Sequence, residues 1–490
     1  MRTVQVKFKK YSSICSLKED VTLLIDKGNT DNALRLIHDF VEHVLTEPLY
    51  VSQVFGSKIL DELCQRAGQA NLEKIKHATN EINHPQLDQP TFVYIVTKLQ
   101  KSGGHTKVIE DFIKSRPQGR HIILSTELAG KSDSDYLLEK FGKKTNVTLE
   151  QAPKENFQKK LTWLQNHLLK IQPEKVYLFN HHQDSVAVSA VQSEMNLNTS
   201  FYHHGDHHMC LGVYMSDFEH IDPHPMGYHN CRNVLGIENS YIPLTVDDKG
   251  KRSTDRGFLQ DGKLITCTAA RSNKIELPYF VSYVEMVPKI LKATGGKHVH
   301  IGRLSLLARL KIRKGLKYND IPLDRFIYIP WVPSVWKALH DHQVDLYVAS
   351  FPYGGGLTLI EAMGAGISVA LHRHIFSRIL SGVDLAYPRA FSWRQPSELF
   401  NYFSSLTSED LENSGKKARI QYEKFHSGDS LQGMLNGTTY DNSIPNDTKE
   451  IFSVERDEWI MWVESQLNIR RMLSKVAYRT FRKLRSRLRA

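Results

Sequence analysis

The sequence predicts two doubly wound α/β domains in tandem, with a small helical appendage before them and a basic amphipathic helix after them. At 490 residues, the chain exceeds the size at which a single hydrophobic core stops growing. Short runs rich in β-branched and aromatic residues alternate with amphipathic stretches in residues 89–246, and a second series of this kind occupies residues 258–425. Such alternation is typical of βαβ units and parallel sheets.

The chain opens with the helical appendage, which we place in residues 1–88. Between Leu17 and Leu87 apolar residues recur at intervals of three and four, as in Leu34, Ile37 and Val41, and few runs resemble strands. We expect a small helical unit without chemistry of its own, available for binding an acceptor or a partner.

The first α/β series, residues 89–246, is the expected N-terminal domain. Its predicted strands are PTFVYIVT, HIILST, KVYLFN and Thr199–Tyr202. Its predicted helices run through Val108–Ile113 and Leu161–Lys170. The polar stretch Asp247–Gly257 then separates this domain from the next one.

The second α/β series, residues 258–425, is the expected C-terminal domain. Its predicted strands are KLITCT, HVHIG, FIYIP, VDLYVAS and ISVALH. Its predicted helices lie around Tyr279–Leu291, Ser334–His340 and Leu357–Met363. A stretch rich in Gly, Asn, Ser and Asp, residues 426–448, is expected to be a loop before a helical, basic tail in residues 449–490.

Composition excludes several classes of protein. The five cysteines are odd in number, scattered and never in a CxxC pair, so the sequence suggests neither a disulfide framework nor a thiolate metal site. The N-terminus lacks the continuous apolar segment of a signal peptide, and no run approaches the roughly 18 apolar residues of a spanning helix. We therefore expect a cytoplasmic protein that is not integral in a membrane.

The positive charge is concentrated in the tail. The net charge is +11, and the residues from Arg470 onward contain no acid. The tail's nine cations are Arg470, Arg471, Lys475, Arg479, Arg482, Lys483, Arg485, Arg487 and Arg489. Without them the rest of the chain carries only about +2, which argues against a nucleic-acid partner, since such proteins spread basic residues over their folded surface.

Apolar residues alternate with these cations at helical spacing, and Trp459 and Trp462 precede them. A helix with one apolar and one basic face is suited to an anionic membrane surface. The sequence therefore predicts peripheral binding to the inner face of the cell membrane. A terminal helix packed on the protein and an RNA-binding tail are the alternatives.

A glycine-rich loop between a strand and a helix carries the strongest chemical signal. An apolar strand, Leu346–Ala349, is followed by Gly354, Gly355 and Gly356 and then by a helix. Such a loop directs backbone N–H groups and a helix N-terminus at a phosphate. Glu361 lies one turn into the helix, where a carboxylate can accept hydrogen bonds from ribose hydroxyls. From spacing alone, a glycine-tolerant turn with a solvated Glu361 fits equally well.

The segment GGGLTLIEAMGAGISV resembles the donor-binding segment of GT-B glycosyltransferases of the group-one, family-four kind. The resemblance implies two Rossmann-like domains. It also implies that Glu361 binds the ribose of a nucleotide sugar and that Gly354–Gly356, with Leu357 and Thr358, face its phosphates. Tyr353 stands where retaining members of the family usually carry a second acidic residue, which leaves inversion and retention both open.

Three further segments resemble the family in the same order along the chain. KLQKSGGHTKVIEDF is similar to a loop of the N-terminal domain that faces the cleft in this family, which implies that Gly103, Gly104 and His105 line the cleft. LITCTAARSNKIELP is similar to the loop whose basic residues meet the donor pyrophosphate, which nominates Arg271 and Lys274. FIYIPWVPSVWKAL is similar to the base-binding segment, in which Trp331 and Val332 would flank the nucleobase.

Histidine and aspartate gather in YHHGDHHMCLG and HIDPHPMGYHNCR, which hold the candidate metal ligands from His203 to His224. The segment follows a predicted strand, at the sheet edge where the cleft residues of doubly wound folds lie. We therefore expect His203 to line the cleft with His181 and Asp184, which close the preceding strand. His204 and Asp206 are the candidates for the general base. Ordinary core or surface histidines are the alternative.

Together these observations predict a hexosyltransferase-like glycosyltransferase that moves a sugar from a nucleotide diphosphate to a glycan or lipid-linked glycan acceptor. The expected context is the synthesis of a bacterial surface polysaccharide, either O-antigen or capsule. We expect no cofactor and no metal, since backbone amides and cations bind the diphosphate in this family. A metal-dependent hydrolase that uses the His203–His224 cluster and a non-catalytic sugar-binding homologue are the alternatives.

Overall fold

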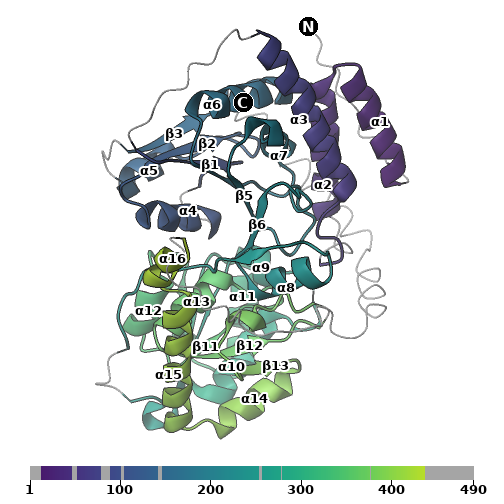
Figure 1. Cartoon of the computed structure of the whole chain (residues 1–490). Coiled ribbons are helices and arrows are strands. Elements are labelled where there is room, and N and C mark those ends of the chain that lie inside the picture. The colour runs from purple at the N-terminus through teal and green to yellow at the C-terminus, as the bar shows by residue number, and fades with distance from the viewer. Residues whose placement is uncertain are drawn as a thin grey trace. The chain divides into compact units, whose positions relative to one another are not determined.

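The computed structural model describes residues 11, 13–46, 52–78, 89–100, 104–141, 146–252, 257–277, 279–375 and 377–435 (Figure 1). Gly103 and the basic tail, residues 449–490, lie outside these ranges.

The chain divides into two compact units. The first runs to Pro223 and includes Cys231–Tyr241, and the second includes His224–Asn230 and continues from Ile242. Within the described part of the chain, no helix combines the length and the apolarity needed to cross a membrane.

Three helices open the first unit: α1 (Ile14–Asp26), α2 (Thr30–Thr46) and α3 (Lys58–Ala78). Ser13 caps α1, since its hydroxyl accepts the N–H of Ser16. Of these, α2 and α3 contact α6 (Phe157–Ile171) and α7 (Ser185–Ala190) and lie beside them in Figure 1, and α1 contacts α2 and α3. Their apolar faces belong to the same hydrophobic cluster as the first sheet, so the predicted helical segment shares its core with the α/β layers.

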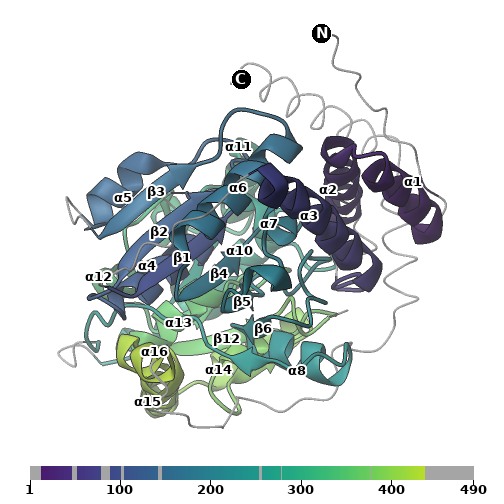
Figure 2. The ribbon, with the colours of Figure 1, turned by 45° about the horizontal axis from the view of Figure 1, so that its top comes forward.

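The first sheet is parallel throughout, and its strand order is β3-β2-β1-β4-β5-β6-β7. Figure 2 shows the strands from β3 to β6 in this order. Its strands are β1 (Thr91–Val96), β2 (Arg120–Ser125), β3 (Val147–Gln151), β4 (Lys175–Phe179), β5 (Thr199–Tyr202), β6 (Glu219–Asp222) and β7 (Ser240–Tyr241). Besides α6 and α7, the helices between β1 and β7 are α4 (Gly104–Lys114), α5 (Ser134–Phe141) and α8 (Pro225–Asn233). Its central strands are buried apolar runs, as expected when helices cover both faces of a sheet.

The second sheet repeats this pattern, with the order β10-β9-β8-β11-β12-β13 and parallel pairing throughout. Its strands are β8 (Leu264–Ala269), β9 (Gly295–Ile301), β10 (Phe326–Ile329), β11 (Leu346–Val348), β12 (Ser368–His372) and β13 (Phe391–Trp393). Its helices are α9 (Ser272–Ile275), α10 (Tyr283–Thr294), α11 (Leu306–Tyr318), α12 (Val335–Asp341), α13 (Gly356–Gly364), α14 (Pro396–Ser405), α15 (Ser408–Phe425) and α16 (Gly428–Leu435).

The prediction of two doubly wound domains is confirmed by these two sheets. In each sheet the third, second and first strands lie on one side, and the fourth and later strands lie on the other. The order therefore reverses between β1 and β4 and between β8 and β11. Open α/β sheets bind ligands outside the carboxyl ends of the strands at such a reversal. Each unit thus has one place where this topology favours ligand binding.

One local prediction is wrong. Residues 428–435, inside the stretch expected to be a loop, form α16. Ser427 explains the difference, because its hydroxyl accepts the N–H of Ser430 and so caps the first turn. Leu431 is buried, so the short helix also gains apolar contact.

Candidate functional site

In the second unit, the strand order brings together the two loops that were nominated for the donor pyrophosphate. The loop into α9 follows β8, and the loop into α13 follows the neighbouring strand β11. The Nζ atom of Lys274 donates to the carbonyl oxygen of Gly354 at 2.9 Å. The N–H of Tyr353 donates to the carbonyl oxygen of Lys274 at 3.4 Å. The nominated lysine is therefore held against the glycine loop by two bonds.

The three glycines of this loop are explained by close approach, since none of them has a positive φ. A Cβ on Gly354 would lie 2.6 Å from the carbonyl oxygen of Ser381. A Cβ on Gly355 would lie 2.5 Å from the Thr358 hydroxyl, and one on Gly356 would lie 3.2 Å from the His224 imidazole. A side chain at any of the three positions would crowd its neighbours. The N–H of Gly354 donates to the carbonyl oxygen of Leu380 at 2.8 Å, so Gly355 and Gly356 are the glycines whose N–H groups can serve a ligand.

The glycine loop leads into a helix N-terminus with positive character. The N-cap of α13 is Gly355, no side chain among the described residues caps it, and its first turn contains no acid. The partial positive charge of the helix start is therefore left uncompensated by the protein's own side chains. Burial lowers the pKa of Lys274, because the ammonium is partly removed from water without a carboxylate to replace it. The ammonium and the helix terminus together form a site for an anion such as a phosphate.

Glu361 sits one turn into α13, as the sequence predicts, and it has a structural partner. Its Oε1 accepts the hydroxyl of Ser334 at 3.2 Å and the N–H of Trp336 at 3.3 Å, at the start of α12. Burial raises the pKa of this carboxyl, and the hydrogen bonds oppose that rise. Glu361 thus ties α13 to α12, and its part in binding ribose stays a prediction.

The other residues predicted to bind the donor lie at loops and helix starts of the second unit. Trp331 is 59% exposed and Val332 is half-buried, both between β10 and α12, and so the indole offers an uncovered face for stacking. Arg271 is exposed at the start of α9. Leu357 and Thr358 are half-buried in the first turn of α13, where the Thr358 hydroxyl accepts that of Tyr347 at 3.0 Å.

In the first unit, three nominated histidines meet beyond the carboxyl ends of β1, β4 and β5. The ring of His105, from the first turn of α4, lies 5.1 Å from that of His181 and stacks at 5.5 Å on that of His204. The Nε2 of His105 also lies 3.0 Å from the carbonyl oxygen of Lys98, just after β1. All three rings are half-buried, and Gly104, which begins α4, is exposed. The structure therefore brings these three rings together at one edge of the sheet, and their part in lining a cleft stays a prediction.

These histidines are neutral near pH 7. Burial, reinforced by the neighbouring rings, lowers the pKa of His181 to about 4 and that of His204 well below its usual range. Burial also lowers the pKa of His105. A neutral imidazole can accept a proton, but a base works best when its pKa is near the working pH. The assignment of His204 as general base thus depends on a bound substrate changing its surroundings.

The nominated acids and His203 are buried inside the first unit. Asp184 is fully buried and accepts the hydroxyls of Thr97 and Thr126, each at 2.6 Å, and the N–H of Ala187. It therefore joins β1 and β2 to the start of α7. Asp206 is 4% exposed, with its carboxylate 3.4 Å from the His207 ring. His203 is fully buried and pairs with Asp222.

Sequence reasoning missed Ser350, which shapes the glycine loop. Its hydroxyl donates to the carbonyl oxygen of Tyr353 at 2.7 Å. Sequence reasoning also overlooked that the His224 imidazole lies close to Gly356, because these two residues are far apart in the sequence. For Ser350 a signal was present, since a serine directly after a buried strand often bonds to the turn that follows.

Comparison with known proteins identifies the fold. No family model and no curated protein sequence matches the chain. Among similar solved structures, HepE from Anabaena in complex with UDP and glucose has a TM-score of 0.53 at 10% identity, over 71% of this chain and 98% of that one. The lipopolysaccharide outer core galactosyltransferase WaaB has 0.52 at 16% identity, over 71% and 98%. A glycosyltransferase from Rickettsia africae has 0.55 at 12% identity, over 72% and 98%.

These structures cover 71 to 72% of the chain and nearly the whole of each neighbour. Similarity at such low identity carries the fold alone. The chain has the GT-B fold, with two Rossmann-like domains and helices before the first of them.

Proposed function

We propose that the chain is a glycosyltransferase that moves a sugar from a nucleotide diphosphate donor to a glycan acceptor. One observation carries the proposal: the uncapped start of α13, its glycine loop and the Lys274 ammonium converge at the strand-order reversal of the second sheet. The complex of HepE with UDP and glucose, and the name of WaaB as a galactosyltransferase, support it by analogy of fold.

In this proposal the donor pyrophosphate rests on the loop Gly354–Gly356, where Gly355 and Gly356 supply the N–H groups because that of Gly354 already donates to Leu380. The ammonium of Lys274 and the guanidinium of Arg271 neutralise it. During transfer the acceptor hydroxyl bonds to the anomeric carbon of the sugar, and the bond from that carbon to the diphosphate oxygen breaks. Negative charge develops on the departing nucleotide, where preorganised cations and dipoles stabilise it most effectively. Glu361 binds the ribose, and Trp331 and Val332 enclose the base.

The acceptor side of the proposal lies in the first unit. The proton of the acceptor hydroxyl passes to His204 or Asp206, since both stand on the loop after β5. Donor binding needs no divalent metal in this scheme, because the protein itself supplies the positive charge. Transfer is therefore expected to proceed at full rate without added magnesium or manganese, whereas a hydrolase with a catalytic metal would be stimulated.

The cellular role proposed is the synthesis of a bacterial surface polysaccharide, O-antigen or capsule, on a lipid-linked acceptor at the inner face of the membrane. The lipopolysaccharide substrate in the name of WaaB and the nine cations of the tail support this assignment. The positive-charge pattern accounts for membrane association, since anionic lipids attract basic segments.

A thermal-shift panel tests the donor class. Nucleoside diphosphates, nucleotide sugars and inorganic pyrophosphate are each added to the full-length protein. A ligand at 100 times its Kd adds about 2.7 kcal/mol of stability, which is readily measured. We expect one nucleoside diphosphate and its sugars to stabilise the protein more than pyrophosphate does, because the base and ribose contacts add to the phosphate contacts. Stabilisation by none of them contradicts the proposal.

A further inference from the structure

Four potential metal ligands meet inside the first unit, and the sheet register brings three of them together. In the pairing of β5 with β6, Phe201 lies beside His220 and Tyr202 beside Ile221, so His203 falls beside Asp222. The N–H of His203 also donates to the carbonyl oxygen of Ile221 at 2.8 Å. Side chains two residues apart on a strand share a face. His203, His220 and Asp222 therefore project from the same side of the sheet.

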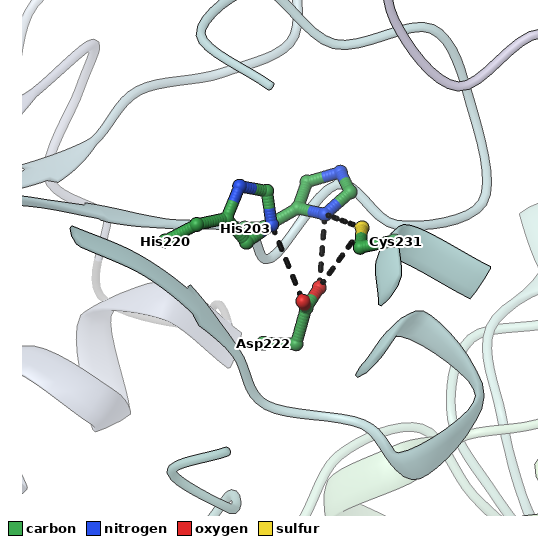
Figure 3. Close-up of side chains that lie close together, drawn as sticks. All are labelled: His203, His220, Asp222 and Cys231. Carbon is green, nitrogen blue, oxygen red and sulfur yellow. Dashed lines mark hydrogen bonds and ion pairs between the residues drawn. The ribbon is translucent and has the colours of Figure 1, made fainter. Parts of the chain in front are cut away.

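The fourth member is Cys231, from α8, the helix that follows β6. Figure 3 shows the four side chains turned toward one another. All four are buried, and their ligand atoms lie within 4.8 Å of one another. The Nδ1 of His203 is 3.0 Å from Asp222 Oδ1 and 3.4 Å from the Cys231 sulfur. That sulfur is 3.6 Å from Asp222 Oδ1, and His220 Nε2 is 3.2 Å from Asp222 Oδ2.

These separations suit a tetrahedral metal. Zinc binds nitrogen, oxygen and sulfur at about 2.0 to 2.3 Å, which places the ligand atoms of a tetrahedron about 3.3 to 3.8 Å apart. Four of the six ligand-atom pairs are 3.0 to 3.6 Å apart, close to that range, and the other two lie within 4.8 Å, so a small closing movement would complete the tetrahedron. A set of two imidazoles, one carboxylate and one thiolate is also typical of zinc.

A purely hydrogen-bonded cluster explains the geometry less well. A ring nitrogen carries at most one hydrogen, yet the Cys231 sulfur and the Asp222 carboxylate both approach the same Nδ1 of His203. In a Cys–His–Asp catalytic triad the thiol and the carboxylate would contact different ring nitrogens. The buried Nε2 of His220 lies near Asp222 but has no hydrogen-bond partner in the part of the chain that the structure describes. Convergence on a shared cation accounts for both features.

We propose that His203, His220, Asp222 and Cys231 bind a structural zinc ion. Carboxylate and thiolate together balance the two charges of zinc, so the buried site is neutral. Four protein ligands leave no open position for a catalytic water, which separates this site from that of a metal-dependent hydrolase. The ion ties β5 and β6 to α8 at the root of the loop that carries His204 and Asp206. This departs from the expectation of a metal-free protein, and it does not depend on the proposed transferase activity.

Asn239 forms a hydrogen bond with the carboxylate of Asp222. Its side-chain amide donates to Asp222 Oδ2 at 2.7 Å and is itself held by Arg232, whose Nε donates to Asn239 Oδ1 at 3.2 Å. Partners of this kind orient metal ligands, and their loss typically weakens metal affinity about 10- to 100-fold. Asn239→Ala is therefore expected to lower zinc affinity within this range.

Metal analysis of the full-length protein, produced with zinc in the medium, tests the proposal. We expect about one zinc ion per chain, because four protein ligands complete one tetrahedral site. Cys231→Ser should lose this zinc. Cys267→Ser is the matched control and should keep it, since Cys267 is an equally buried cysteine in β8 of the second unit.

Cobalt substitution provides a second measurement that needs no variant, in case Cys231→Ser does not fold. Cobalt in the wild-type protein is expected to give the intense visible absorption of a tetrahedral site and a thiolate-to-cobalt charge-transfer band. Absence of both zinc and this charge-transfer band from the folded wild-type protein would overturn the proposal. Retention of zinc at the same stoichiometry by folded Cys231→Ser would overturn it equally.

Discussion

Lys274→Met tests the donor site most directly, because it removes one positive charge while keeping a similar side-chain volume. The Nζ atom lies 2.9 Å from the carbonyl oxygen of Gly354 and 3.8 Å from the position that a Cβ would take on Gly355. A phosphate seated on the glycine loop would therefore sit about 4 Å from the ammonium. At this distance opposite unit charges attract by about 4 kcal/mol at an effective dielectric constant of 20.

Part of this attraction is lost, since the ammonium is already bonded to Gly354 and partly hydrated. Hydrogen bonds to charged groups contribute about 1.5 to 3 kcal/mol in proteins, and we take about 2 to 3 kcal/mol for Lys274. The expected result is a rise of about 30- to 150-fold in the Kd of the nucleoside diphosphate that stabilises the wild type. The free energy of unfolding without ligand should change by less than about 1 kcal/mol, because methionine avoids the cost of burying a charge.

Calorimetric titration of the nucleoside diphosphate measures the affinity, and chemical denaturation of the free protein measures the stability. Lys292→Met is the matched control, because it removes the same charge from an exposed position on α10 and should leave the Kd unchanged. Lys274→Arg, which keeps the charge, should lose less affinity than Lys274→Met. A Kd for Lys274→Met within threefold of the wild type would refute the placement of the pyrophosphate.

Three further predictions concern the loop, the acid response and the tail. Gly354→Ala should destabilise the protein by about 1 to 3 kcal/mol in chemical denaturation, because the added Cβ meets the backbone of Ser381. Gly428→Ala is the control and should cause no such loss, because the space around Gly428 is open. The low pKa of His181, about 4 against 6.5 when unfolded, means that the unfolded chain binds the extra proton between these values, so stability falls as pH falls from 6.5 to 4. His181→Gln should remove up to about 3 kcal/mol of this pH dependence in denaturation curves at several pH values. Asp61, whose pKa burial raises to about 7, acts in the opposite direction, but it does so equally in the wild type and in His181→Gln. If the free energies of unfolding of these two proteins differ by the same amount at pH 4 and pH 6.5, the argument is contradicted. Removing residues from Asn468 onward should abolish salt-sensitive binding to anionic liposomes while activity on a soluble acceptor survives, and equal binding by both proteins would favour a packed terminal helix.

The sequence alone determined the features that depend on local chemistry. Alternating apolar runs and amphipathic stretches predict two parallel α/β layers, because side-chain periodicity follows from backbone geometry. The glycine loop before α13 could also be predicted, because three successive glycines stand between an apolar strand and a helix, although its contacts with Ser381 and His224 are tertiary. Even the meeting of His105, His181 and His204 could be expected, because the carboxyl ends of parallel strands share one edge of a sheet.

The tertiary structure decided which distant side chains touch. The capping of α12 by Glu361 and the burial of Asp184 beneath Thr97 and Thr126 depend on how whole elements pack, and no periodicity in the sequence encodes such contacts. The same holds for the buried cluster that includes Asp222 and Cys231. Strand register aligns its two histidines and its aspartate, and the path of α8 adds the cysteine, so four residues that the sequence scatters over three elements become neighbours only after the sheet has formed.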